Sequence, residues 1–317
     1  MTNNTTTTAY PENAKTMKPA TLTSSEISDL VENADDAYLS YHHTEARLFL
    51  GSPNMEECEG VMSLSPELES DNFEDYDPST VAGALRDYVG NIRGICLLDT
   101  KYDGSLRNGL EIASQPASLA YHMRDYNWAN ILKILSTYSE SHDAGTCGLH
   151  VHVSRKSLGH TDEARDLVIA KLLYLIEKWF TPDGALGKFS RRDMNCDDDT
   201  YWCKTNKIGI KSSDKRKDFD RKYKEYKSTD EYSDRYHALN LTNHSTIEFR
   251  MFRGTHNPET FAATLQLVEA MVRFCKTHTT TEVQTCRFGD IVATCKYAEL
   301  ASYCTRRGIC LRQTRNA

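Results

Sequence analysis

Two segments of the chain alternate apolar and polar residues, which is the period of a β-strand with one buried face. In the first segment, Leu149, Val151 and Val153 occupy every second position. His150 and His152 lie between them and therefore share the opposite face. The pattern predicts a half-buried strand that presents two imidazoles on its polar side.

The second alternating segment, residues 246–253, places apolar side chains at odd positions, so Glu248 and Arg250 face the other way. A shorter apolar run over residues 236–241 precedes it, and the residues between the two are typical of a turn. We therefore expect a hairpin whose polar face carries a carboxylate and a guanidinium.

A further hairpin is predicted over residues 92–114. It begins with an apolar run, turns at Asp103, and continues into a strand-like segment that carries Glu111. Strands with carboxylate, guanidinium and imidazole groups on their polar faces are typical of the walls of a site that handles metal ions and phosphate.

Three longer segments, residues 128–138, 164–179 and 258–275, repeat apolar residues at the spacing of an amphipathic helix. Strands joined as hairpins and interrupted by long helices favour an α+β architecture. The chain has no internal repeat, and we expect a single catalytic domain over residues 36–317.

Two segments differ in composition from this pattern. Residues 1–35 are rich in Thr, Asn and Ser without a sustained period, which predicts a disordered tail. Residues 204–235 mix many Lys and Arg residues with acidic ones. Such a segment is typical of an exposed helix or loop, or of a lid-like insertion that brings a cation to a polyphosphate, and the sequence leaves both open.

The composition, with 39% apolar and 26% charged residues among 317, is that of a globular protein on the polar side. The formal net charge of −7 argues against nucleic acid as a partner. No apolar run approaches the roughly 18 residues of a membrane helix, and the N-terminus lacks the apolar centre of a signal peptide. We therefore expect a cytoplasmic protein without a membrane partner.

The ten cysteines are scattered and include no Cys-x-x-Cys pair. This distribution, without a signal peptide, favours reduced and buried thiols over a disulfide framework. A zinc site built on Cys196 and Cys203 is a weaker alternative, because their spacing is unusual for chelation.

Six short motifs follow one another in the order found in a known family. They are Asp-Gly-Ser-Leu from Asp103, Gly-Leu-Glu-Ile-Ala-Ser-Gln-Pro from Gly109, Cys-Gly-Leu-His-Val-His-Val from Cys147, Phe-Ser-Arg-Arg from Phe189, Arg-Tyr-His-Ala-Leu-Asn from Arg235 and Thr-Ile-Glu-Phe-Arg-Met-Phe-Arg-Gly-Thr from Thr246. With these motifs the chain resembles the putative amidoligase family, a branch of the carboxylate–amine ligases. The resemblance covers about residues 92–275.

The resemblance implies a glutamine synthetase-like catalytic domain, in which antiparallel strands flanked by helices form a funnel that holds ATP and Mg²⁺. It also implies a reaction in which the γ-phosphoryl group of ATP passes to a carboxylate to give an acyl phosphate. An amine then displaces phosphate and leaves an amide. The partners would be carboxylate and amine substrates, either small molecules or peptides.

The resemblance and the residue types together assign roles within the motifs. Glu111 and Glu248 offer the oxygen ligands that Mg²⁺ prefers, with His150 in support. Arg250 and Arg253 can hold the transferring phosphoryl group through planar, charge-assisted hydrogen bonds. The expected catalytic residues are Arg250, Arg253, Glu248 and His150, and the expected nucleotide or substrate contacts are His152, Ser105, Asn240, Arg191 and Tyr236.

One feature of the family is not apparent in the sequence. Its members typically open with a strand that bears a Gly-x-Glu-x-Glu pattern and supplies metal-binding carboxylates. The nearest candidate, residues 47–57, has the wrong spacing. Either this strand is degenerate, or other acids such as Asp99 and Asp103 compensate for it, or catalysis is impaired.

Other interpretations remain open. His150 and His152 could bind Zn²⁺ in a hydrolase, with a glutamate as third ligand or base, although Ser154 stands where the familiar His-x-His-x-Asp pattern has its aspartate. The chain could also be a catalytically inactive binding protein of the same fold. Taken alone, Glu248 and Arg250 also fit a simple ion pair on a solvated sheet.

Overall fold

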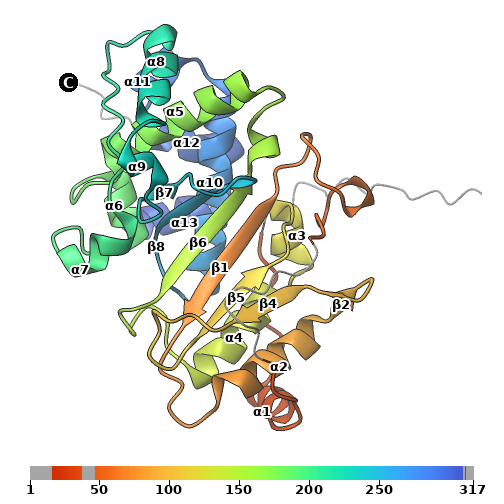
Figure 1. The fold of residues 1–317 in the computed structure, drawn as a ribbon. Coiled ribbons are helices and arrows are strands. Elements are labelled where there is room, and N and C mark those ends of the chain that lie inside the picture. Colours follow the sequence, from red (N-terminus) through yellow and green to blue (C-terminus); the bar gives the residue numbers. More distant parts are fainter. Residues whose placement is uncertain (1–15, 38–46, 310, 312–317) are drawn as a thin grey trace, which may run out of the picture.

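A six-stranded antiparallel sheet forms the centre of the computed structural model, which describes residues 16–37, 47–309 and 311. The strand order is β4-β5-β1-β6-β8-β7, and the sheet is open at β4 and β7 (Figure 1). The strands of this sheet are Leu64–Ser70 (β1), Leu98–Lys101 (β4), Leu110–Ser114 (β5), Gly148–Ser154 (β6), Leu239–Asn240 (β7) and Thr246–Arg253 (β8). A separate small hairpin consists of Asn91–Ile92 (β2) and Ile95–Cys96 (β3).

Helices surround the sheet, and α10 runs behind β6 and β8 (Figure 1). The α-helices are Ser24–Glu32 (α1), Pro78–Val89 (α2), Leu119–Arg124 (α3), Trp128–Tyr138 (α4), Asp162–Trp179 (α5), Ala185–Ser190 (α6), Asp197–Thr200 (α7), Arg216–Tyr226 (α8), Asp230–Ser233 (α9), Pro258–Thr277 (α10), Thr280–Thr285 (α11), Phe288–Cys295 (α12) and Ala298–Arg306 (α13). Short 3₁₀ helices span Pro53–Met55 (η2), Arg155–Leu158 (η3) and Tyr201–Cys203 (η4).

One face of the sheet is apolar and the other is polar, as the alternating segments predict. Leu149, Val151 and Val153 of β6 are fully buried in the same core as Ile247 and Phe249 of β8. Burial of this face fixes the register of the strands, because a shift by one residue would expose every core side chain. The polar side chains of β6 and β8 are thereby held on the opposite face.

The predicted hairpins and long helices are confirmed. β4 pairs with β5 inside residues 92–114, and β7 pairs with β8. α4, α5 and α10 occupy the three segments with helical spacing. The structure therefore shows the expected mixture of helices with an antiparallel sheet, and that sheet is not closed.

A β-bulge in β8 changes the direction of its last residues. Phe249 pairs with Val151, and Phe252 pairs with Leu149, so β8 advances by three residues while β6 advances by two. The extra residue shifts the alternation, so that Phe252 is buried in the core while Arg253 remains partly exposed. Strict alternation from residue 246 onward would have placed Arg253 on the apolar face.

Strand β1 is a central element that the sequence analysis did not find. It lies between β5 and β6. Pro66 is unusual in a central strand because proline has no N–H to donate, and the ladder with β5 begins only after it, at Glu67. Ser65, Glu67 and Glu69 have the spacing of the Gly-x-Glu-x-Glu pattern, with serine in place of glycine. This strand, and not residues 47–57, therefore carries glutamates at the spacing of the pattern, and of the alternatives left open it fits a degenerate first strand.

The prediction of a disordered tail over residues 1–35 is wrong for its later part. Helix α1 begins with a capping box, which satisfies backbone N–H groups at its start. Its Ile27 and Val31 side chains are buried, and the helix packs against α2. Residues 1–15 lie outside the described part of the chain.

The charged segment over residues 204–235 is anchored to the rest of the fold. Its helix α8 buries Phe219 and Tyr223 and packs against α5. Lys227 also forms an ion pair of 2.6 Å with Asp166 of α5. These contacts favour an exposed helix with a structural role, and movement of this segment as a lid stays a prediction.

Two expectations from composition can be compared with the structure. The cysteines that the structure describes are free thiols, in agreement with the reduced state predicted for them. None of the described helices combines the length and the apolar character needed to cross a membrane.

Candidate active site

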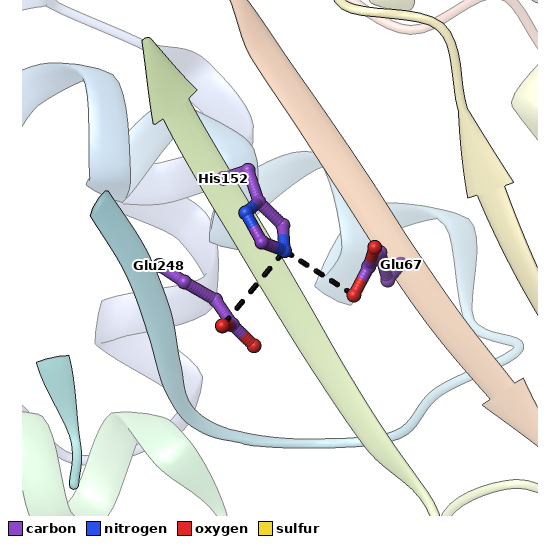
Figure 2. A group of neighbouring side chains, drawn as sticks. All are labelled: Glu67, His152 and Glu248. Atoms are coloured by element: carbon purple, nitrogen blue, oxygen red, sulfur yellow. Dashed lines mark ion pairs between the residues drawn. The ribbon is translucent and has the colours of Figure 1, made fainter. Parts of the chain in front are cut away.

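Glu67, His152 and Glu248 meet on the polar face of the sheet from three neighbouring strands (Figure 2). His152 lies on β6, between Glu67 on β1 and Glu248 on β8. Its Nε2 atom is 3.2 Å from Glu67 Oε2 and 3.9 Å from Glu248 Oε2. The register of the sheet brings these side chains together, because His152 lies directly opposite Glu248. We call these three residues the histidine cluster.

The charges of the histidine cluster stabilise one another. Burial lowers the pKa of His152, but Glu67 and Glu248 outweigh this effect and raise the pKa to about 9. Burial raises the pKa of Glu67, but His152 and Lys101 hold it well below its usual range. Burial likewise raises the pKa of Glu248, and His152 and Arg250 lower it below its usual value. Near neutral pH the cluster therefore contains an imidazolium and two carboxylates.

Further polar side chains surround Glu248. Its carboxylate accepts hydrogen bonds from Arg250 Nη1 at 2.5 Å, from Asn240 Nδ2 at 2.7 Å and from Asn243 Nδ2 at 3.3 Å. His150 Nδ1 lies 3.6 Å from Glu248 Oε1. Burial and the nearby Arg250 charge lower the pKa of His150 to about 3, so this imidazole is neutral at physiological pH.

Three carboxylates form a second group on the same face. Glu69 of β1 lies directly opposite Glu111 of β5, and Asp103 approaches them from the β4–β5 connection. Each offers an oxygen atom within 4.8 Å of the others. Burial raises the pKa of Glu69 to about 7, and burial together with the Glu67 charge raises the pKa of Glu111 to about 8. Burial therefore favours the protonated forms of Glu69 and Glu111 within this group of three, which we call the acidic cluster.

Lys101 of β4 links the two clusters. Its Nζ atom is 3.3 Å from Glu111 Oε1 and 3.7 Å from Glu67 Oε1. Burial lowers the pKa of Lys101, but the two glutamates outweigh burial and raise it. Asp99, which the sequence offered as a compensating metal ligand, lies 3.3 Å from Arg47 Nη1.

The acidic cluster suits a hard divalent cation better than the histidine cluster does. Its donors are all oxygen atoms, which Mg²⁺ prefers, whereas the imidazolium of the histidine cluster must lose its proton before it can bind a metal. The three residues predicted as one metal site are therefore divided. Glu111 belongs to the acidic cluster and Glu248 to the histidine cluster, whereas His150 belongs to neither cluster.

Arg250 lies on the polar face, as its position in the strand predicts, and Arg192 lies close to the same end of β8. The two side chains are 7% and 5% exposed. Arg192 Nη1 is 3.2 Å from Asp199 Oδ1, and Arg192 Nη2 donates to the carbonyl oxygen of Phe252 at 3.4 Å. A second buried arginine thus reaches the strand that carries Arg250.

Arg191 was expected to contact nucleotide, but in the structure it binds the backbone. Its guanidinium donates to the carbonyl oxygens of Arg253 and Gly254. Burial lowers its pKa to about 10. Arg191 therefore holds the chain just after β8.

Arg253 lies at a cavity of about 320 Å³. The cavity is lined by Gly145, Asp193, Cys196, Asp198, Asp199 and Arg253. Arg253 Nη1 is 3.5 Å from Asp199 Oδ2, and its Nε donates to the carbonyl oxygen of His142 at 3.1 Å. None of these lining residues belongs to the histidine or acidic cluster.

The other predicted contacts lie at different depths. Asn240 is buried and bonded to Glu248. Ser105 is exposed, and its backbone N–H donates to Asp103 of the acidic cluster at 2.7 Å. Tyr236 packs against Trp202, with ring centroids 4.7 Å apart. Of these three residues, Asn240 has the most direct contact with the clusters.

The residues assigned from the sequence did not include Glu67, Glu69 or Lys101, and within the Phe-Ser-Arg-Arg motif Arg191 was chosen over Arg192. The period of two between Glu67 and Glu69 was a usable signal, but the neighbouring proline obscured it. Lys101, and the choice of Arg192 over Arg191, give no comparable local signal, because the partners of these side chains come from other strands and loops. Their place in the site depends on the arrangement of the sheet.

Comparison with protein families adds an independent observation. Residues 96–272 match the model of a family described as putative amidoligase enzyme. The comparisons with curated proteins and with solved structures gave no match. The matched region contains every strand of the main sheet except β1. Because the match covers more than half of the 317 residues, the chain belongs to the amidoligase family.

Proposed function

We propose that this protein is an ATP-dependent carboxylate–amine ligase that forms an amide or peptide-like bond through an acyl phosphate. Membership of the amidoligase family supports amide-bond formation. The observation that carries the finer proposal is the acidic cluster on the sheet face that also bears buried Arg250. This combination suits phosphoryl transfer, because carboxylates hold Mg²⁺ and guanidinium groups stabilise phosphoryl oxygens.

The oxygen donors of Glu69, Asp103 and Glu111 fit Mg²⁺ as its ligands. When bound, Mg²⁺ neutralises charge on the nucleotide phosphates. The raised pKa values of Glu69 and Glu111 belong to the metal-free protein, and a cation would favour their ionised forms. Binding of Mg²⁺ should therefore release protons near pH 7.

The histidine cluster and its neighbours would orient the reacting groups. Glu248 holds Arg250 and His152, and Asn240 fixes Glu248 in turn. Neutral His150 can form a hydrogen bond without adding charge. In the proposed reaction, a substrate carboxylate oxygen attacks the γ-phosphorus and ADP leaves. The amine nitrogen then attacks the acyl carbon, phosphate leaves, and the amine loses a proton.

Two alternatives to a ligase were left open by the sequence, an inactive binding protein and a zinc hydrolase. An inactive binding protein was suggested by a missing pair of glutamates, and β1 supplies Glu67 and Glu69 at the expected spacing. A zinc hydrolase is suggested by the donor set of the histidine cluster, one imidazole and two carboxylates. Burial lowers the pKa of His152, but Glu67 and Glu248 raise it to about 9, so a zinc ion would have to displace a proton from this imidazole.

Calorimetric titration of ATP with Mg²⁺ tests the proposal. We expect wild-type protein to bind in the micromolar to millimolar range that is common for enzyme substrates, and only when Mg²⁺ is present. Glu111→Gln and Glu248→Gln should each weaken binding at least tenfold. The matched control is Glu32→Gln, which changes an exposed glutamate of α1.

The outcomes separate the candidate functions. Magnesium-dependent binding that is lost in both site variants supports the ligase and justifies a search for carboxylate–amine pairs that release ADP. Absence of binding by folded wild-type protein contradicts the proposal. A stoichiometric zinc ion that survives dialysis and is lost in His152→Ala would favour the hydrolase instead.

A further inference from the structure

Arg192 and Arg250 share an unusual feature, a buried donor atom without an acceptor. In each guanidinium group the Nε atom has no hydrogen-bond partner among the described residues. Both side chains are more than nine-tenths buried. A buried donor that lacks an acceptor is destabilising, so its presence in two neighbouring arginines indicates that a ligand supplies the acceptors.

Both arginines are attached to β8 near its bulge. Arg250 belongs to this strand, and Arg192 Nη2 reaches the carbonyl oxygen of Phe252, on the other side of the bulge. The positive charges of Arg192 and Arg250 also act on the same two groups. Both charges oppose the effect of burial on Glu69, which raises its pKa, and both add to the effect of burial on His150, which lowers its pKa. Both guanidinium groups are therefore close enough to the polar face of the sheet to influence its charged side chains.

The remaining donors of both arginines are held in fixed directions. Arg250 Nη1 donates to Glu248 Oε1, and Arg192 Nη1 is paired with Asp199 Oδ1. Asp199 is shared with a second cation, because Arg253 Nη1 also lies 3.5 Å from its carboxylate. One carboxylate therefore holds two guanidinium groups in place near this end of β8.

We propose that Arg192 and Arg250 together form an oxyanion-binding site at the bulged end of β8. This inference rests on the proposed function and assigns Arg192, in place of Arg191 or Arg253, as the second arginine of the reaction centre. The ligand carries a planar or tetrahedral group of negatively charged oxygens, which matches the donor geometry of guanidinium. That group is either the terminal phosphoryl of the nucleotide or the carboxylate of the acyl substrate.

Four probes distinguish these sources in the full-length protein. They are the magnesium complexes of ADP and of a non-hydrolysable ATP analogue, inorganic phosphate, and glutarate as a simple dicarboxylate. Each is titrated calorimetrically into wild-type protein and into Arg192→Gln and Arg250→Gln. Arg287→Gln is the matched control, because Arg287 is an exposed arginine that pairs with Asp290 and lies outside the candidate site and the charged segment.

We expect both site variants to lose affinity for the ATP analogue by about 10- to 100-fold, as for a lost hydrogen bond to a charged group. Their affinity for ADP should stay within threefold of wild type, and this result assigns the site to the terminal phosphoryl. Unchanged nucleotide affinity with loss of glutarate binding assigns it to the substrate carboxylate. Unchanged affinity for all four probes in both variants would overturn the proposal.

The proposal and the ligase function can fail separately. If wild-type protein binds phosphate or glutarate through both arginines but binds no nucleotide, the oxyanion site stands and the ligase function fails. If Glu248→Gln loses ATP binding while Arg192→Gln keeps every affinity, the ligase function stands and the oxyanion site fails. Arg192→Lys and Arg250→Lys keep the charge and serve if a glutamine variant does not fold, and they should show a smaller loss in the same direction.

Discussion

At the scale of single residues, Glu248 connects the parts of the candidate site. It contacts His152 of the histidine cluster, accepts hydrogen bonds from Arg250 and Asn240, and lies beside His150. Removing one member of such a buried network leaves the others with unpaired charge, which is strongly destabilising. Substitutions that preserve shape and alter only charge are therefore the most informative at this site.

Glu67→Gln tests the histidine cluster. The change removes one of the two carboxylates that stabilise the His152 imidazolium. We expect the pKa of His152 to fall from about 9 towards its ordinary value of about 6.5. Titration of the His152 ring by NMR measures this shift.

The control for this experiment is Glu56→Gln. Glu56 is exposed and lies in the segment that the sequence suggested for the missing strand. Its substitution should leave the titration of His152 unchanged. An equal His152 pKa in wild type and Glu67→Gln would contradict the ion pair between β1 and β6.

At the scale of secondary-structure elements, short segments hold the site strands in place. Asn206 accepts a hydrogen bond from the backbone N–H of Leu239 and donates to its carbonyl oxygen and to Tyr226 of α8. Leu239 precedes Asn240, which bonds to Glu248. The charged segment is thus linked to the site through β7, whatever its mobility.

Phe219→Ala tests whether α8 is structural. Phe219 is fully buried, and its truncation should lower the free energy of unfolding by about 3–5 kcal/mol. Urea unfolding measures the loss. Lys217→Ala, which changes an exposed residue of the same helix, should stay within about 0.5 kcal/mol of wild type. A small effect at Phe219 would mean that α8 is only loosely attached, as a lid requires.

Ile27→Ala tests the packing of α1. The Ile27 side chain is 1% exposed, so the substitution should destabilise the protein by about 2–5 kcal/mol. Ser25→Ala is the control because Ser25 is exposed on the same helix. If thermal unfolding shows the same midpoint for both variants, α1 does not contribute to the cooperative core.

At the scale of the whole molecule, buried carboxylates connect stability to pH. Burial raises the pKa of Glu69 to about 7 and of Glu111 to about 8, whereas both ionise near 4.3 in an unfolded chain. At pH values between the unfolded pKa of about 4.3 and the folded pKa values of about 7 and 8, the folded, metal-free protein binds more protons than the unfolded chain. Its stability must therefore fall as the pH rises.

We expect the metal-free protein to lose about 2–4 kcal/mol of unfolding free energy between pH 6.5 and pH 8. His152 adds to this fall, because its pKa of about 9 lies above the unfolded value and its contribution is lost as the pH rises. Below pH 6.5, buried His122 and His256, whose pKa values burial lowers to about 4, act in the opposite direction. Chemical unfolding at several pH values in the presence of EDTA measures the slope.

Glu111→Gln should flatten this slope, because it removes the group with the higher pKa of the acidic cluster. Millimolar Mg²⁺ should raise the melting temperature more at pH 8 than at pH 6, since the cation binds ionised carboxylates. Stability that rises between pH 6.5 and pH 8 in metal-free protein would show that the acidic cluster is not buried as described.

Particular residues show how far the sequence predicts this protein. The period of two around His150 and Glu248 correctly predicts β6, β8 and the face on which these side chains lie. The same reasoning failed at β1, where one proline obscured the period, and it does not predict the bulge that keeps Arg253 off the apolar face. Local rules describe regular strands and give no warning of an irregular one.

The sequence by itself therefore determined the main hairpins, the long helices, the buried face of the sheet and, through its motifs, the family. Only the tertiary structure decided that β1 lies at the centre, that Lys101 links two clusters, and that Arg192 reaches the strand of Arg250. The physical reason is that periodicity follows from local backbone geometry. The neighbours of a side chain across strands depend on sheet order and register, which the packing of the whole core selects.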